Sequence, residues 1–97
     1  MTIVMFYHSK VKEDSVEKMD GLRKEFRQLY EQHGIDVIGR WKSIENPHES
    51  YYMVSYVSED DYQHKTRTLH EDENYLKLSS QLNEIRTDFN AIRLVPL

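Results

Sequence analysis

Residues 2–8 read Thr-Ile-Val-Met-Phe-Tyr-His, with large apolar side chains at odd and at even positions. Successive side chains of a β-strand point to opposite faces of the sheet, so this segment predicts a strand that is apolar on both faces. Residues 51–57, Tyr-Tyr-Met-Val-Ser-Tyr-Val, share this property. Each of these strands therefore needs cover on two sides.

A helix is predicted between these strands, over about residues 15–33. Gly34 follows it, because glycine adopts without steric cost the left-handed conformation that often ends a helix. The apolar side chains of the segment recur at steps of three and four and form one stripe: Val16, Met19, Leu22, Phe26 and Leu29.

Residues 35–44 form the second predicted strand, and strict alternation within it places Gly39 and Trp41 on one face. Residues 46–49, Asn-Pro-His-Glu, are typical of a turn. Together with the strand at 51–57 they predict a β-hairpin.

Two helical segments, about residues 58–69 and 73–86, and a last strand over 90–95 complete the chain. The order is β-α-β-β-α-β, with the second helical part in two pieces. This order predicts an α+β, ferredoxin-like fold, in which a four-stranded antiparallel sheet carries its helices on one face. We expect a single domain over residues 1–97.

The second face of this sheet would expose the apolar side chains of two strands. An exposed patch of that kind marks an interaction surface, and an identical sheet is the simplest cover for it. We therefore expect a homodimer that forms through the open face of the sheet.

Composition excludes several classes of protein. The net charge is −4, from 13 Lys and Arg against 17 Asp and Glu, which disfavours nucleic acid as a partner. Cysteine is absent, so thiolate nucleophiles and thiolate metal sites are excluded. No apolar run approaches the roughly 20 residues of a membrane span, and the start of the chain lacks the pattern of a signal peptide. We expect a cytoplasmic protein with no membrane partner.

Tyrosine is the most informative residue type, with seven among 97 residues. Its ring is apolar and its hydroxyl is polar, which suits the wall of a half-hydrated cavity, although dimer interfaces also favour it. Tyr7, Tyr52 and Tyr56 are the candidates to bind a ligand and to line any space between the sheet and its partner. Trp41 is interpreted as buried, either in the core or as an aromatic wall of such a pocket.

Catalytic groups are not evident from motifs. The five histidines show no zinc-binding spacing, so no metal site and no cofactor are expected. His33 ends the first helix, where packing or capping explains it, but it is also a candidate to reach the cavity. His33 and His70 are the candidates for proton transfer. Arg67 is a candidate to bind the carboxylate of a ligand.

Three segments resemble the NIPSNAP family: residues 30–41, with His33-Gly34 and Gly39-Arg40-Trp41; the apolar strand 52–56; and residues 67–75 before the last helix. The resemblance extends over about residues 26–95. It implies the dimeric α/β barrel superfamily, which includes monooxygenases and isomerases that use no cofactor. Fold alone does not choose among such activities.

Three functional hypotheses follow. The first is a homodimer that binds a small organic molecule in a cavity between sheet and helices. The second is a cofactor-free monooxygenase or isomerase, so enzymatic activity stays an open question at this point. The third is a non-catalytic interaction module, for which a filled interior would be the sign.

Overall fold

The computed structural model describes residues 1–97 and contains four strands, three α-helices and one 3-10 turn. The order and type of the predicted elements are confirmed, and β1 and β4 are longer than predicted. In chain order the elements are β1 (Ile3–Val11), η1 (Glu13–Ser15), α1 (Val16–Gln32), β2 (Asp36–Lys42), β3 (Glu49–Tyr56), α2 (Glu59–Glu71), α3 (Glu73–Ile85) and β4 (Arg86–Leu94).

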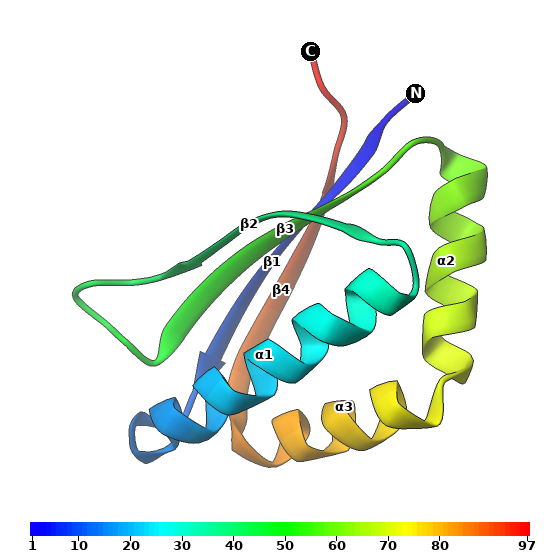
Figure 1. The fold of residues 1–97 in the computed structure, drawn as a ribbon. Helices are drawn as coiled ribbons and strands as arrows, with labels where there is room; N and C mark the ends of the chain where they lie inside the picture. The colour runs from blue at the N-terminus through cyan, green and yellow to red at the C-terminus, as the bar shows by residue number, and fades with distance from the viewer.

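The four strands form one antiparallel sheet in the order β2-β3-β1-β4. All three helices lie on one face of this sheet, and the other face is open (Figure 1). Because β1 and β4 are antiparallel neighbours, the N-terminus and the C-terminus leave the sheet at the same end (Figure 1). The α+β ferredoxin-like prediction is confirmed.

The two central strands have large side chains on both faces, as predicted. On β1 the odd positions face the helices, and Ile3, Met5 and Val11 are buried there. The even positions face the open side, where Phe6 stacks on Tyr51 of β3 with ring centroids 5.9 Å apart. The helices bury their own apolar stripes against the first face, through Met19, Leu22, Leu29, Leu69, Leu78, Leu82 and Ile85.

A β-bulge in β2 changes the direction of its side chains. Val37 pairs with Val54, but the next paired residue is Gly39, opposite Met53, so Ile38 is extra. One extra residue exchanges the two faces for everything that follows. Beyond the bulge, Arg40 therefore points toward the helices.

The same bulge places Trp41 on the open face, whereas strict alternation would have put it on the face of Val37. Trp41 is 51% exposed and pairs with Tyr51, so the interpretation that it is buried is wrong for this chain by itself. Its indole covers Gly39, where an added Cβ would lie 2.2 Å from a ring carbon. Gly39 has no side chain, and the ring takes that space.

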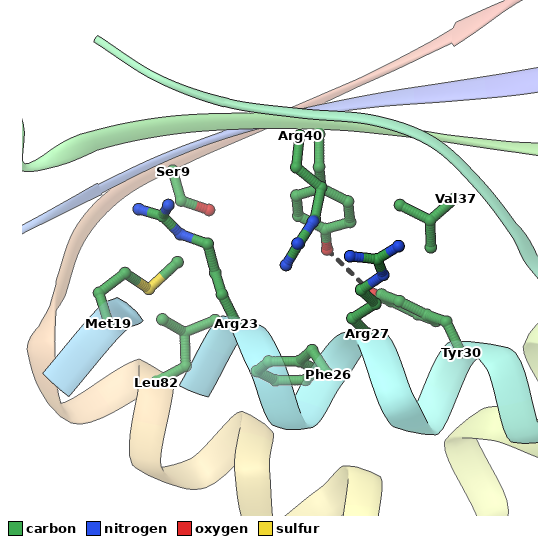
Figure 2. Close-up of a pocket in the computed structure, with 10 residues that line it drawn as sticks. Ser9, Met19, Arg23, Phe26, Arg27, Tyr30, Val37, Arg40 and Leu82 are labelled. Carbon is green, nitrogen blue, oxygen red and sulfur yellow. Dashed lines mark hydrogen bonds between the residues drawn. The ribbon is translucent and has the colours of Figure 1, made fainter. Parts of the chain in front are cut away.

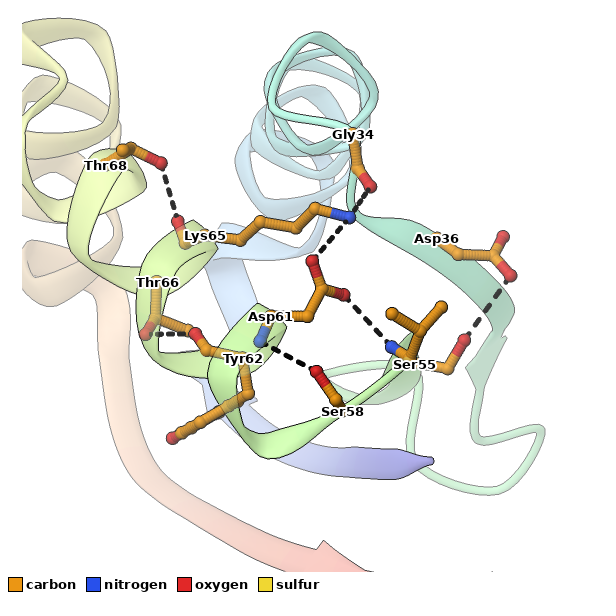
Figure 3. A network of polar contacts seen from close by, with 10 residues as sticks. Gly34, Asp36, Ser55, Ser58, Asp61, Tyr62, Lys65, Thr66 and Thr68 are labelled. Carbon is orange, nitrogen blue, oxygen red and sulfur yellow. Dashed lines mark hydrogen bonds and ion pairs between the residues drawn. The ribbon is translucent and has the colours of Figure 1, made fainter. Parts of the chain in front are cut away.

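A polar network fixes the first turn of α2 against the sheet and against the end of α1 (Figure 3). Lys65 Nζ donates to the carbonyl of Gly34, 2.8 Å away, and pairs with Asp61. Asp61 accepts from the amide of Val57, which lowers the pKa of its carboxyl, and the Ser58 hydroxyl caps the helix. Gly34 has φ 70°, which glycine tolerates, and it ends α1 as predicted.

We expect Gly39→Ala to displace the Trp41 ring and to lower the free energy of unfolding by about 1 kcal/mol, since the overlap can be relieved only by moving that side chain. Because Trp41 is the only tryptophan, a shift in its fluorescence emission reports the displacement directly. Urea unfolding measures the loss of stability.

Gly21→Ala is the matched control. An added Cβ there meets nothing within 4 Å, and in the middle of α1 alanine should stabilise the protein by about 0.5–1 kcal/mol. Unchanged emission and stability in Gly39→Ala would contradict the account of how these two residues fit together.

Candidate functional site

A cavity of about 370 Å³ lies between the sheet and the helices. Ligand pockets generally occupy about 300–1,000 Å³ and are lined mainly by apolar and aromatic groups. Six of the seven tyrosines line this space, and we call it the tyrosine cavity. They come from β1, β3 and all three helices: Tyr7, Tyr30, Tyr52, Tyr56, Tyr62 and Tyr75.

The rings of the tyrosine cavity pack against one another and keep its walls in place. Tyr7 stacks on Tyr52, with centroids 4.8 Å apart, and on Phe89 of β4 at 5.9 Å. Tyr56 meets Tyr62 edge to face at 5.1 Å. Offset and edge-to-face arrangements of this kind stabilise aromatic clusters beyond simple burial.

Four of the tyrosine hydroxyls, those of Tyr7, Tyr30, Tyr52 and Tyr56, are neutral hydrogen-bond donors. Burial raises the pKa of Tyr52 to about 12 and raises those of Tyr7, Tyr30 and Tyr56 above the usual tyrosine value. The hydroxyls of Tyr30 and Tyr52 bond to each other over 2.9 Å. The other four form no hydrogen bond with the protein, so they are free to bond a molecule in the cavity.

Polar groups with other chemistry lie at the rim of the tyrosine cavity. The Arg86 guanidinium covers the Phe89 ring, 4.3 Å from its centroid. His70 lies against Tyr75, with ring centroids 5.1 Å apart, and is exposed to solvent. The site therefore combines aromatic walls with hydroxyl donors, one imidazole and one fixed positive charge.

The structure brings together only part of the predicted site. Tyr7, Tyr52, Tyr56 and His70 line the cavity. Three other predicted residues lie outside its lining: Trp41 on the opposite face of the sheet, Arg67 on the exposed side of α2, and His33 at the end of α1.

His33 has a structural partner. Its Nε2 lies 2.8 Å from an Asp72 carboxylate oxygen, and the other oxygen of Asp72 accepts from the amide of Asn74 at the start of α3. The hydrogen bond with His33 lowers the pKa of Asp72 below the usual 3.8, and the hydrogen bond from the amide of Asn74 makes a smaller contribution in the same direction. The pair ties the end of α1 to the junction of α2 and α3.

Several cavity residues were not identified from the sequence, namely Tyr30, Tyr62, Tyr75, Arg86 and Phe89. Tyr75 lies on the apolar stripe of its helix, and Tyr30 lies next to another stripe, which are the available signals. No group of three His, Asp or Glu side chains is arranged to hold a metal ion. None of the helices has the length and apolar character required to cross a membrane.

Comparison with known proteins gives relatives in structure alone, since no protein-family model and no curated protein sequence matches the chain. A NIPSNAP family protein from Agrobacterium tumefaciens superposes with a TM-score of 0.87 at 19% identity, over 100% of this chain and 94% of that chain. An uncharacterised NIPSNAP domain protein from Burkholderia xenovorans gives 0.85 at 12% identity, over 98% and 94%.

A candidate antibiotic biosynthesis monooxygenase from Bacteroides thetaiotaomicron has the same fold, with a TM-score of 0.79 at 14% identity over 99% of this chain and 90% of that chain. The chain thus has the fold of NIPSNAP family proteins, as the sequence resemblance predicts, and shares it with monooxygenase-type proteins. At these identities the likeness establishes the fold.

The His33–Asp72 pair predicts a pH-dependent contribution to stability. Because the pKa of Asp72 is lowered in the folded state, its contribution is complete above the usual Asp value of 3.8 and disappears as the pH falls through the folded value. Asp72→Asn should therefore be less stable than the wild type near neutral pH, and the difference should vanish in acid. Urea unfolding over a pH series measures this.

Glu73→Gln is the control, because Glu73 is the exposed neighbour and forms no side-chain hydrogen bond. It should unfold as the wild type does at each pH. A constant difference between the wild type and Asp72→Asn over the whole series would show that the charge of Asp72 is not responsible.

Proposed function

We propose that this protein binds a small organic molecule in the tyrosine cavity. The observation that carries the proposal is the gathering of six of the seven tyrosines around one cavity of about 370 Å³. A filled interior would instead have favoured a non-catalytic interaction module.

The chemistry of the walls indicates the class of ligand. Stacked rings favour a flat aromatic body, and the free hydroxyls of Tyr7, Tyr56, Tyr62 and Tyr75 favour oxygen atoms that accept hydrogen bonds. Arg86 at the rim suits a partial or full negative charge. An aromatic ketone, quinone or phenol meets these requirements.

We propose further that the working unit is a homodimer that forms through the open face of the sheet. This face carries Val4, Phe6, Met53, Tyr51 and Trp41 from three neighbouring strands, and β4 adds Ile92, which is 49% exposed. The helices already cover the other face (Figure 1). A second copy presents the same apolar surface, so each of the two sheets would bury the open face of the other.

A second candidate function is oxygenation or isomerisation of the bound molecule without a cofactor. Two observations favour it: His70 lies at the rim of the cavity, where it can accept a proton from a ligand, and the fold is shared with a candidate monooxygenase. His33 is less suited to this role, because it is engaged with Asp72 outside the cavity lining.

Ligand binding is tested by thermal unfolding with hydroxylated aromatic ketones and quinones, for example juglone and quercetin. A ligand at about 100-fold its Kd stabilises the folded state by about 2.7 kcal/mol and raises the melting midpoint accordingly. Ser79→Phe fills the cavity from α3 and should weaken binding at least about tenfold, or about 1.4 kcal/mol.

Ser80→Phe is the matched control, since Ser80 is exposed and lies outside the cavity lining. The proposal fails if no compound stabilises the wild type, or if Ser79→Phe binds as well as the wild type does. Mass spectrometry of the same aerobic mixtures separates the two candidate functions, because only an enzyme converts the ligand to a product.

The homodimer is tested by size-exclusion chromatography with light scattering. The wild type should have twice the chain mass of 11.7 kDa. Ile92→Glu places a charge on the open face and should give a folded monomer. Leu76→Glu is the control, because Leu76 is 53% exposed on α3, away from that face. A monomeric wild type at micromolar concentration would disprove the dimer.

A further inference from the structure

A second, smaller cavity lies between α1 and the β2 side of the sheet, and we call it the arginine pocket (Figure 2). Its volume of about 30 Å³ provides room for about two water molecules or for one small polar group. Arg23 and Arg27 enter it from α1, and Arg40 enters it from β2 (Figure 2).

Arg23 is the most buried of the three arginines, and two of its donor atoms lack a hydrogen-bond acceptor. Its Nε and Nη2 atoms are buried and have no hydrogen-bond partner in the protein. The only carboxylate that pairs with it is that of Asp20, at 3.5 Å, and the other oxygen of Asp20 already accepts from Lys42 at 2.9 Å. Buried polar groups are nearly always satisfied, so these two donors point to an acceptor supplied from outside the chain.

Arg40 adds a charge that no group of the protein neutralises. It forms no ion pair and no side-chain hydrogen bond, while Arg27 pairs with Glu31 at 3.3 Å on the solvent side. Burial lowers the pKa of Arg23, Asp20 opposes this shift, and repulsion from Arg40 adds to it. The pocket is thus a concentration of positive charge in a chain whose net charge is −4.

The β-bulge of β2 is what brings Arg40 to the pocket. Strict alternation from Val37, without the bulge, would direct Arg40 to the open face. With it, the side chain hangs between the sheet and α1, opposite the helix that carries Arg23 (Figure 2). Two guanidinium groups from different elements therefore border one small space: that of Arg23 is half-buried, and that of Arg40 is exposed.

We infer that the arginine pocket binds one oxyanion group, a carboxylate or a phosphate. Such a group supplies two or more acceptor oxygens and a negative charge, which matches the planar donors of Arg23 and the free charge of Arg40. Tyr30, Tyr52 and Phe26 line both this pocket and the tyrosine cavity. The oxyanion is either a free ion or the acidic group of an organic molecule that lies against this shared wall.

The test is thermal unfolding of the whole chain in a cationic buffer, with sodium phosphate or sodium benzoate replacing sodium chloride at constant ionic strength. A saturable rise of the melting midpoint with phosphate supports a free oxyanion, and a rise with benzoate alone supports the carboxylate of an organic acid. The absence of a saturable rise with either salt would overturn the inference.

Two variants locate the effect. Arg23→Met replaces the buried guanidinium by an apolar side chain, and Arg40→Gln removes the exposed charge. Each should weaken the apparent affinity for the anion at least tenfold. In chloride, Arg23→Met should be no less stable than the wild type, because two buried donors without hydrogen-bond partners are removed. Arg40 is at the surface, so its variant remains informative if Arg23→Met does not fold.

Lys24→Met is the matched control, since Lys24 follows Arg23 in α1 and is exposed. It should keep the full response to the anion. An equal loss in all three variants, or no loss in any, would show a general salt effect and would overturn the inference. Ser79→Phe, which fills the tyrosine cavity, should keep its response to phosphate, so the failure of one site is distinguishable from the failure of the other.

Discussion

The sheet has two apolar faces, and the chain supplies helices for only one of them. This constraint originates in β1 and β3, the two central strands, whose odd and even positions both carry large side chains. Covering the first face produces the core and encloses the tyrosine cavity, because three helices lie over one sheet without filling the whole space between them. The second face carries the proposed contact with another copy. The proposed binding site and the proposed dimer contact thus have a common origin.

Much of the fold follows from local sequence patterns. The two-sided strands, the apolar helix stripe and Gly34 give the right elements in the right order, since each depends on neighbours a few residues away. The direction of the Trp41 side chain does not follow from such patterns, because a bulged strand has the same kinds of residue as a regular one. Hydrogen bonding to β3 determines where that residue is placed.

The candidate site could also be predicted in part from the sequence. Strand alternation and pairing group Tyr7, Tyr52 and Tyr56 on one face, but the sequence does not tell which face the helices cover, and the three lie under the helices rather than toward a partner. Tyr62 comes from α2, whose position depends on the network around Lys65, so sequence spacing does not place it. The position of Arg23 could have been noticed in the sequence, because it comes four residues after Met19 and three before Phe26 and so lies on the apolar side of the helix. A charge at such a position requires a partner.

The hydrogen bond between Tyr30 and Tyr52 gives the wall between the two cavities a direction. Each hydroxyl has a single proton, so only one of them donates in this bond, and the proton of the other is left for an acceptor elsewhere. If Tyr30 donates, the outward proton belongs to Tyr52, and the reverse arrangement exchanges the roles. The wall therefore has two possible arrangements of its protons, and in each of them one hydroxyl proton stays available to an acceptor in the space that both tyrosines line.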